Sequence, residues 1–129
     1  MAKVLVVDDD PDVLNLVSFR LRKAQHKVIA VSGGLEALKV VAERGAPDVA
    51  VLDVMMPGLD GLTLLQRVRD LDGMEKLPAI FLSARVQPED IEVGRALGAT
   101  YLTKPFIATA LLNAIDAALV EPESELEGW

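Results

Sequence analysis

Short apolar runs alternate with longer amphipathic segments along most of this chain. Each run holds four residues, and runs of this length bounded by polar residues predict buried strands. The five runs are residues 4–7, 28–31, 49–52, 79–82 and 100–103. Apolar residues at helical spacing follow every run, which predicts five helices. The predicted helices are residues 12–23, a segment that follows Gly33-Gly34 and stops at Gly45, residues 60–70, residues 88–97 and a segment after Pro105.

The apolar stripes of these helices differ in strength. The expected inward-facing residues are Leu35, Leu38, Val41 and Ala42 on the second helix, and Ile107, Leu111, Ala114, Ile115 and Ala118 on the fifth. The fourth helix has the weakest stripe, which is little more than Ile91 and a few neighbours. Gly94 also lowers its helix propensity by about 1 kcal/mol relative to alanine. We therefore expect the fourth helix to be the element that shifts most readily.

The strict alternation of strand and helix predicts the fold class. Strands that alternate with helices form right-handed βαβ crossovers, and these build a parallel sheet covered by helices on both faces. The expected fold is therefore an α/β three-layer sandwich with a five-stranded parallel sheet and five helices.

Composition and charge narrow the class of protein. The chain has 129 residues, of which 51% are apolar and 26% charged, values typical of one globular domain. It contains no cysteine, which excludes disulfides and thiolate metal sites. No apolar run approaches the roughly 18 residues of a membrane span, so we expect a cytoplasmic protein without a membrane partner. A net charge of −7 disfavours direct binding of nucleic acid.

Three acidic residues stand where two of the predicted strands end. Asp8 and Asp9 follow the run 4–7, and Asp53 follows the run 49–52. Parallel strands end at a common edge of the sheet, where open α/β folds bind their ligands. Three carboxylates at one place repel one another unless a divalent cation lies among them, and Mg²⁺ prefers such oxygen ligands. Ser83 and Lys104 follow the last two strands and bring a hydroxyl and an ammonium to the same edge.

Four ordered motifs show a resemblance to a known family. They are residues 6–10 (VVDDD), 52–61 (LDVMMPGLDG), 82–84 (LSA) and 103–106 (TKPF). Together they resemble the receiver domain of two-component response regulators over roughly residues 3–119. The resemblance implies a flavodoxin-like sheet with strand order 2-1-3-4-5. We expect residues 1–119 to form the receiver domain and residues 120–129 to be an acidic tail or the start of a linker.

The resemblance also implies a chemical role for each residue at the sheet edge. Asp53 would accept a phosphoryl group from a partner's phosphohistidine, on a sensor histidine kinase or a phosphotransfer protein. Asp9 would bind Mg²⁺ directly and Asp8 through water or more weakly, with Asp53 and the backbone carbonyl of Met55 as further ligands. Lys104 and Ser83 would contact the phosphoryl oxygens.

A switch follows from the same resemblance. Ser83 would move toward the phosphoryl group, and Tyr101 would fill the space behind it. The surface formed by the fourth helix, fifth strand and fifth helix would then bind a downstream protein. Met55 and Arg85 would flank the phosphoryl group and influence its lifetime. The family also implies a cis peptide between Lys104 and Pro105.

Other functions stay open at this point. A phosphate-independent interaction module of the same fold is one alternative. A Mg²⁺-dependent aspartyl-phosphate phosphatase is disfavoured, because such enzymes place a second Asp where this chain has Met55. We expect no enzyme activity beyond the chain's own phosphotransfer and dephosphorylation. The chain is expected to be a stand-alone receiver or an excised part of a longer regulator, and a monomer or a phosphorylation-linked dimer.

Overall fold

The computed structural model describes residues 2–84 and 87–120 and confirms the predicted alternation. The strands are β1 (Lys3–Val7), β2 (Lys27–Val31), β3 (Val49–Asp53), β4 (Ala79–Ser83) and β5 (Ala99–Thr103). The helices are α1 (Pro11–Lys23), α2 (Gly34–Arg44), α3 (Gly61–Arg69), α4 (Pro88–Ala96) and α5 (Ala108–Ala118). No helix among the described residues has the length and hydrophobicity needed to cross a membrane.

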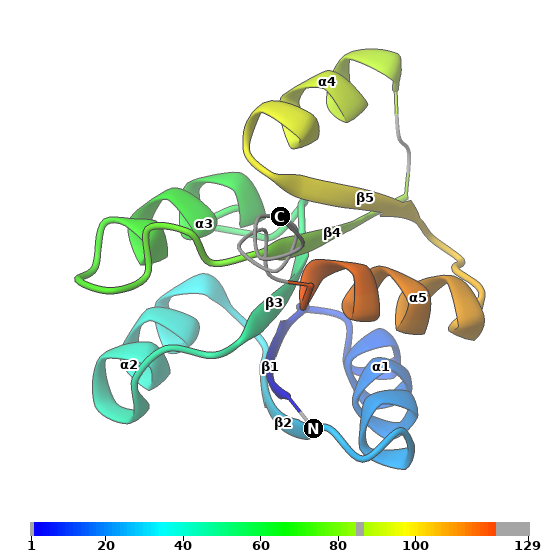
Figure 1. Cartoon of the computed structure of the whole chain (residues 1–129), viewed down its shortest axis with the longest axis horizontal. Helices are drawn as coiled ribbons and strands as arrows, with labels where there is room; N and C mark the ends of the chain where they lie inside the picture. Colours follow the sequence, from blue (N-terminus) through cyan, green and yellow to red (C-terminus); the bar gives the residue numbers. More distant parts are fainter. Residues whose placement is uncertain (1, 85–86, 121–129) are drawn as a thin grey trace, which may run out of the picture.

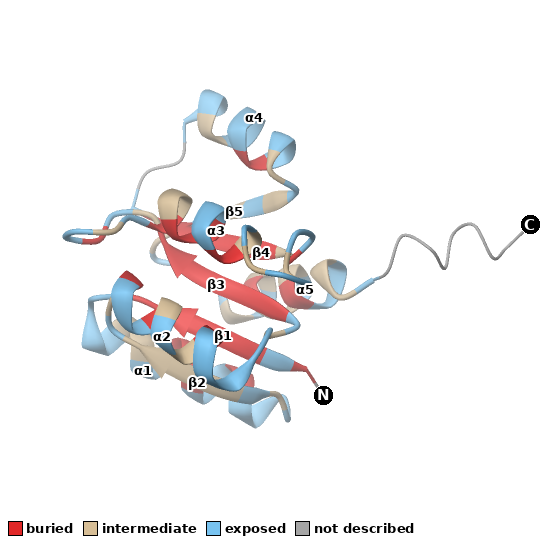
Figure 2. Ribbon diagram, turned by 90° about the vertical axis from the view of Figure 1, so that its left-hand side faces the viewer, coloured by how far each residue is buried: buried red, intermediate tan, exposed pale blue. Residues whose placement is uncertain are grey.

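The sheet is entirely parallel and has the strand order β2-β1-β3-β4-β5, as predicted. Helices lie on both of its faces (Figure 1). Alternate residues of each strand point to opposite faces, so the core consists of two clusters. One lies between the sheet and α2 and α3, and the other between the sheet and α1 and α5. Strands β1, β3 and β4 are largely buried, whereas the edge strands β2 and β5 are only partly covered (Figure 2).

Aspartate caps begin the two helices that follow the acidic strand ends. The Asp10 carboxylate accepts a hydrogen bond from the Asp12 backbone N–H at 2.9 Å, and Pro11 occupies the first turn of α1. The Asp60 carboxylate accepts one from the Thr63 backbone N–H at 2.8 Å at the start of α3. Each cap of this kind stabilises a helix by about 1 kcal/mol. The caps therefore fix where the chain turns away after β1 and β3.

The inward face of α2 differs from the prediction. Leu35 is 73% exposed and Ala42 is also exposed, whereas Gly34, Ala37 and Val41 are buried. A Cβ atom added at Gly34 would lie 2.8 Å from the Leu59 side chain. Because α2 approaches the chain before α3 this closely, the small residues Gly34 and Ala37 face inward where Leu35 and Ala42 were expected. The other two predicted residues, Val41 and Leu38, do pack against the core.

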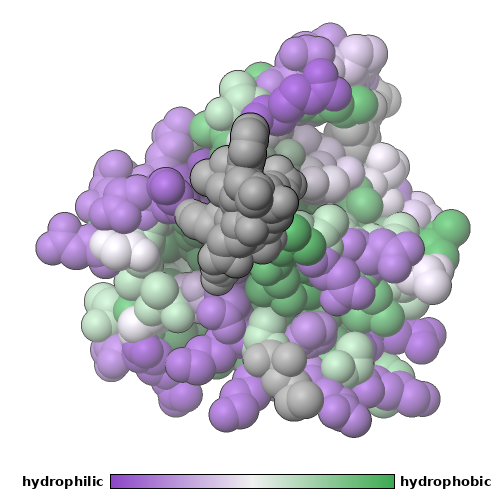
Figure 3. Space-filling view, viewed as in Figure 1, coloured by the Kyte–Doolittle hydropathy of each residue, from purple (hydrophilic) through white to green (hydrophobic). Residues whose placement is uncertain are grey.

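Two further expectations about apolar faces were wrong. Ile107 is 71% exposed, because α5 begins at Ala108 and Ile107 stands before it in an extended conformation, outside the helical period. Ile91 is 49% exposed, and Gly94 is the one buried residue of α4. Hydrophilic residues dominate the outer rim of the face shown in Figure 3, including much of α4 at its top, and hydrophobic residues appear mainly nearer its centre. Helix α4 is therefore held by few apolar side chains.

Candidate functional site

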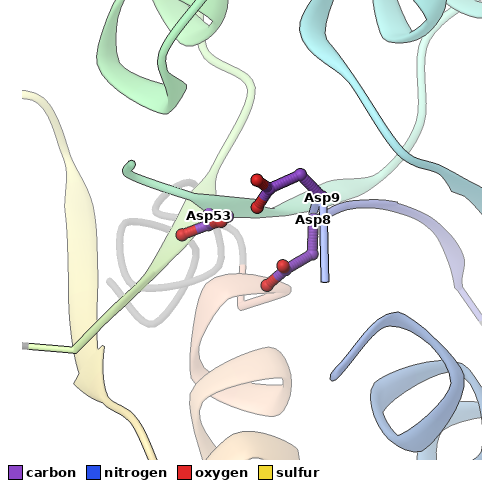
Figure 4. A group of neighbouring side chains, drawn as sticks. All are labelled: Asp8, Asp9 and Asp53. Carbon is purple, nitrogen blue, oxygen red and sulfur yellow. The ribbon is translucent and has the colours of Figure 1, made fainter. Parts of the chain in front are cut away.

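The three predicted carboxylates lie together at the carboxyl edge of the sheet. Strands β1 and β3 are neighbours, with Val7 paired to Leu52, so Asp8 and Asp9 emerge beside Asp53. Each contributes one oxygen, and these oxygens lie within 4.8 Å of one another (Figure 4). Asp8 is fully buried and Asp53 is 4% exposed, whereas Asp9 is exposed to solvent. The cluster is thus a buried acidic pair with a third acid at its mouth.

Lys104 brings a positive charge into this cluster. Its Nζ lies 2.9 Å from Oδ2 of Asp8 and 3.4 Å from Oδ1 of Asp53. The Lys104 backbone N–H donates to the Ser83 carbonyl at 2.7 Å, and the Lys104–Pro105 peptide is cis, as expected. Burial opposes the charge on Lys104, but its hydrogen bonds and charge interactions with Asp8 and Asp53 outweigh burial and raise its pKa. Lys104 therefore stays protonated between the two buried acids.

Asp53 is the acid whose protonation responds most to this environment. Burial raises its pKa from 3.8 to about 6, helped by a hydrogen bond with Asp9 and by the negative charge of Asp8. Lys104 acts in the opposite direction without cancelling the effect. In addition, the Met55 backbone N–H donates to Oδ1 of Asp53 at 3.3 Å. Any cation that joins the cluster will favour the ionised form of Asp53.

The donor set fits a hard divalent cation. Oδ1 of Asp8 accepts a hydrogen bond from the Asp10 backbone N–H at 2.9 Å. Oδ2 is buried, and among the described residues its contact is with the Lys104 ammonium at 2.9 Å alone. Oxygens that share one Mg²⁺ lie at most about 4.2 Å apart, close to the separation seen here. The chemistry and the proximity of these oxygens therefore suit Mg²⁺.

Ser83 lies on the strand next to Asp53. Asp53 pairs with Leu82 of β4, and Ser83 is the following residue, 7% exposed. Met55 also follows Asp53 closely, and its side chain is 76% exposed. The expected site residue Arg85 lies outside the described residues, as do residues 121–129 of the expected tail.

Tyr101 lies on β5, next to the strand β4 that carries Ser83, and its ring contacts α4. Its ring centroid is 5.1 Å from that of Phe81 on β4, and the two planes are inclined at 39°. On the α4 side, a Cβ atom added at Gly94 would lie 2.7 Å from Cε1 of Tyr101. Burial, and to a smaller extent the charge of Asp90, raise the pKa of the Tyr101 hydroxyl. Tyr101 therefore fills the space between β4 and α4.

Arg69 is a structural residue that sequence reasoning missed. Its Nε and Nη2 donate to the Leu77 carbonyl at 3.1 and 2.7 Å, and its Nη1 donates to the Leu97 carbonyl at the end of α4. Burial lowers the pKa of Arg69. An arginine in the last turn of a helix looks like an ordinary surface residue, so the sequence carries no signal of this bridge. The contact between α4 and Tyr101 differs in this respect, because Gly94 inside the helix was a visible signal for it in the sequence.

Comparison with known proteins assigns the family. The family model described as the response regulator receiver domain matches residues 4–116, nearly the whole described chain. The chain therefore belongs to the receiver domains of response regulators. Members of this family are signalling switches that are phosphorylated by histidine kinases and bind Mg²⁺ at an acidic pocket.

Two relatives differ in how much of their own length the chain covers. The chain is 37% identical over 131 residues to the alkaline phosphatase synthesis transcriptional regulatory protein PhoP of Bacillus subtilis, a match that covers 97% of the chain and 53% of PhoP. A 14.6 kDa uncharacterized protein of Leptolyngbya boryana is 41% identical, with 87% of the chain and 86% of that protein covered. The chain thus spans about half the length of PhoP and most of the shorter relative.

Solved structures agree with the family. Chemotaxis protein CheY4 of Vibrio cholerae superposes with a TM-score of 0.84 at 35% identity, covering 92% of this chain and 99% of CheY4. A putative response regulator from Chloroflexus aurantiacus also gives a TM-score of 0.84, at 34% identity, covering 93% of this chain and 98% of that one. The flavodoxin-like strand order predicted from the sequence is therefore shared with known receiver structures.

Proposed function

We propose that this chain is a phosphorylation-dependent switch whose acceptor is Asp53. The observation that carries the proposal is the buried Asp8–Lys104–Asp53 arrangement, with Nζ of Lys104 at 2.9 and 3.4 Å from the two acids. The phosphoryl donor would be a phosphohistidine of a sensor histidine kinase or phosphotransfer protein. The output would be binding of a downstream protein through the α4–β5–α5 surface.

In the transfer step, an Asp53 carboxylate oxygen attacks phosphorus. The P–N bond of the donor phosphohistidine breaks, and the imidazole nitrogen keeps its electron pair. The ion expected at Asp8, Asp9, Asp53 and the Met55 carbonyl, Mg²⁺, would neutralise charge on the transferring group when bound. Lys104 holds a further positive charge at the same place, and Met55 donates its N–H to Asp53. The chain's residues thus orient the acceptor and offset its charge.

The charges of the site explain why a conformational change would follow. Three carboxylates, a divalent cation and Lys104 sum to about zero, and an acyl phosphate then adds negative charge. The Ser83 hydroxyl on the neighbouring strand can donate to a phosphoryl oxygen. Movement of Ser83 would alter the space in front of Tyr101, whose ring supports α4. Phosphorylation would therefore reposition or loosen α4.

The extent of the module is part of the proposal. Residues 1–119 would form the receiver and residues 120–129 an acidic tail or the start of a linker. The receiver would act alone or within a longer regulator, and as a monomer or a phosphorylation-linked dimer. These alternatives would determine which partner binds the α4–β5–α5 surface, called here the output surface. Met55 and Arg85 would influence the lifetime of the acyl phosphate, since both lie two residues beyond a site residue.

Intact-mass spectrometry tests the acceptor directly. Wild type, Asp53→Asn and the control Asp116→Asn, an exposed acid on α5, are incubated with acetyl phosphate with and without Mg²⁺. We expect one added phosphoryl group in wild type and the control, dependent on Mg²⁺ and removed by base, and none in Asp53→Asn. Stoichiometric, base-labile phosphorylation of Asp53→Asn would show that another carboxylate is the acceptor. If wild type gave no adduct, a beryllofluoride titration would distinguish rapid hydrolysis of the acyl phosphate from a phosphate-independent module.

A further inference from the structure

A cavity lies at the amino end of the strands, at the opposite end of the sheet from Asp53. It has a volume of about 360 Å³ and is bounded by the first residues of β1 and β2 and by the end of α2. Its walls are largely apolar and include Leu5, Ile29, Val40 and Val41. A volume of this size is within the range of small-molecule sites, which are mostly apolar with a few convergent polar groups. The polar side chains that line this cavity are all cationic, and all are exposed to solvent.

Three positive side chains line this cavity from three separate elements. Lys3 and Lys27 are paired in register on the neighbouring strands β1 and β2. Side chains alternate along a strand, so both lysines share the sheet face of Leu5 and Ile29, which pack toward α2. Arg44 joins them from the last turn of α2. The fold therefore places two lysines side by side and a guanidinium across from them.

These three side chains are not paired with a carboxylate of the described residues. None of the three cations forms an ion pair in the part of the chain that the structure describes, and no acidic residue lines the cavity. The nearby Asp48 carboxylate accepts a hydrogen bond from the Lys3 backbone N–H at 2.8 Å. Like charges paired across strands are destabilising. A cationic cavity in a chain of net charge −7 is a local reversal that an anionic ligand would relieve.

We propose that this cavity binds a small amphipathic anion, a molecule with a carboxylate, sulfonate or phosphate group and a compact apolar body. The anionic group would lie among Lys3, Lys27 and Arg44, and the apolar body against Val40 and Val41. The site is separate from the acceptor at the other end of the sheet. It does not depend on phosphorylation of Asp53.

The test is a titration of the full chain with 2-naphthoate and with its neutral counterpart 2-naphthalenemethanol. NMR spectra record the shifts of the amide resonances. We expect saturable shifts with 2-naphthoate, centred on residues 3–5, 27–29 and 40–47, and at least about tenfold weaker binding of the alcohol. The Asp53→Asn variant should bind 2-naphthoate as wild type does, so failure of the acceptor assignment would leave this result unchanged. Equal binding of both probes, or no saturable binding, would overturn the proposal.

Charge variants identify the residues involved. Lys27→Gln and Arg44→Gln should each weaken binding of 2-naphthoate by about tenfold. The control Lys39→Gln should not weaken it, because Lys39 is an exposed lysine of α2 that does not line the cavity. Unchanged amide spectra outside the cavity would show that each variant is folded. Equal weakening by Lys39→Gln would show that the effect comes from the net charge of the protein, and it would overturn the proposed binding site. If only an acidic peptide, such as one with the sequence of residues 121–129, shifted these resonances, the cavity would be a peptide site instead.

Discussion

The ring of Tyr101 occupies the space that a side chain at Gly94 would fill. A Cβ atom at residue 94 would lie 2.7 Å from Cε1 and 2.8 Å from Cδ1 of Tyr101, and 3.2 Å from the Ala99 carbonyl oxygen. Gly94 is also the one buried residue of α4. The contact between this helix and β5 therefore depends on a missing side chain in α4 and an aromatic ring on the strand.

Substitution of Gly94 by alanine should destabilise the protein. Alanine is favoured over glycine by about 1 kcal/mol inside an exposed helix, but the methyl group would force Tyr101 or α4 to move, at about 2 kcal/mol. Urea unfolding should therefore show a net loss of stability. In a Tyr101→Ala background the same substitution should become stabilising, because the ring is gone. The control Gly33→Ala adds a Cβ whose nearest neighbour is 3.6 Å away, so its cost should be that of a weaker N-cap on α2 and should be the same with and without Tyr101. A stabilising Gly94→Ala in wild type would show that the ring does not need this space.

The contact also shows where sequence reasoning succeeds and fails. The parallel sheet and the convergence of Asp8, Asp53 and Lys104 were predictable, because both follow from short apolar runs and from the geometry of parallel strand ends. The order of the strands came only from the resemblance to receiver domains. The glycine in α4 was interpreted only as a weakness of the helix, since propensity is a local property and the ring of Tyr101 is brought to it by the fold.

Helix faces and side-chain bridges were predicted less well for a related reason. The apolar pattern of α2 favoured Leu35 over Ala37, but close packing near Leu59 requires the smaller residue inside. Ile107 matched the period of α5 and nevertheless lies before its first turn. The bridge from Arg69 to two carbonyls depends on backbone positions in other elements, which no pattern of side chains encodes.

The raised pKa of Asp53 predicts a pH dependence of stability in the absence of Mg²⁺. The folded-state pKa is about 6 and the ordinary value is 3.8, so between these values the folded protein holds a proton that the unfolded chain has lost. The contribution of Asp53 to the free energy of unfolding should therefore be fully present below about pH 4 and lost by about pH 6, a change of about 3 kcal/mol.

Asp53→Asn tests this dependence, because the amide cannot ionise. The difference in unfolding free energy between the variant and wild type should grow in favour of the variant as pH rises from about 4 to about 6, and then stay constant. Urea unfolding in the presence of a chelator at several pH values measures it. Asp116→Asn serves as the control for removal of an exposed acid. Parallel pH profiles for wild type and Asp53→Asn would contradict the prediction.

Lys104 should stabilise the buried position of Asp8. Asp8 is fully buried, and the described residues offer its Oδ2 no other positive or hydrogen-bonding partner. Lys104→Met keeps the apolar stem and removes the charge, so without Mg²⁺ it should cost about 3 kcal/mol of stability. Addition of Mg²⁺ should restore more stability to this variant than it adds to wild type, since a cation among the acids replaces the missing charge.

The measurement is urea unfolding of Lys104→Met and wild type with Mg²⁺ and with a chelator. Lys39→Met removes an exposed lysine and should show neither the loss nor the enhanced response to Mg²⁺. The prediction fails if both lysine variants lose the same stability, because the effect would then be one of net charge and not of the pair with Asp8.

Arg69 should hold the end of α4 against α3 and β4. Its guanidinium donates to the carbonyls of Leu77 and Leu97 at once, which a lysine ammonium cannot match with the same geometry. Arg69→Lys should therefore cost about 2 kcal/mol and speed hydrogen exchange of the α4 amides, while the amides of α1 keep their rates. Arg67→Lys, an exposed arginine on the same helix, is the matched control. Unchanged exchange in α4 would contradict this role of Arg69 and would point to the packing of Gly94 against Tyr101 as the contact that holds the helix.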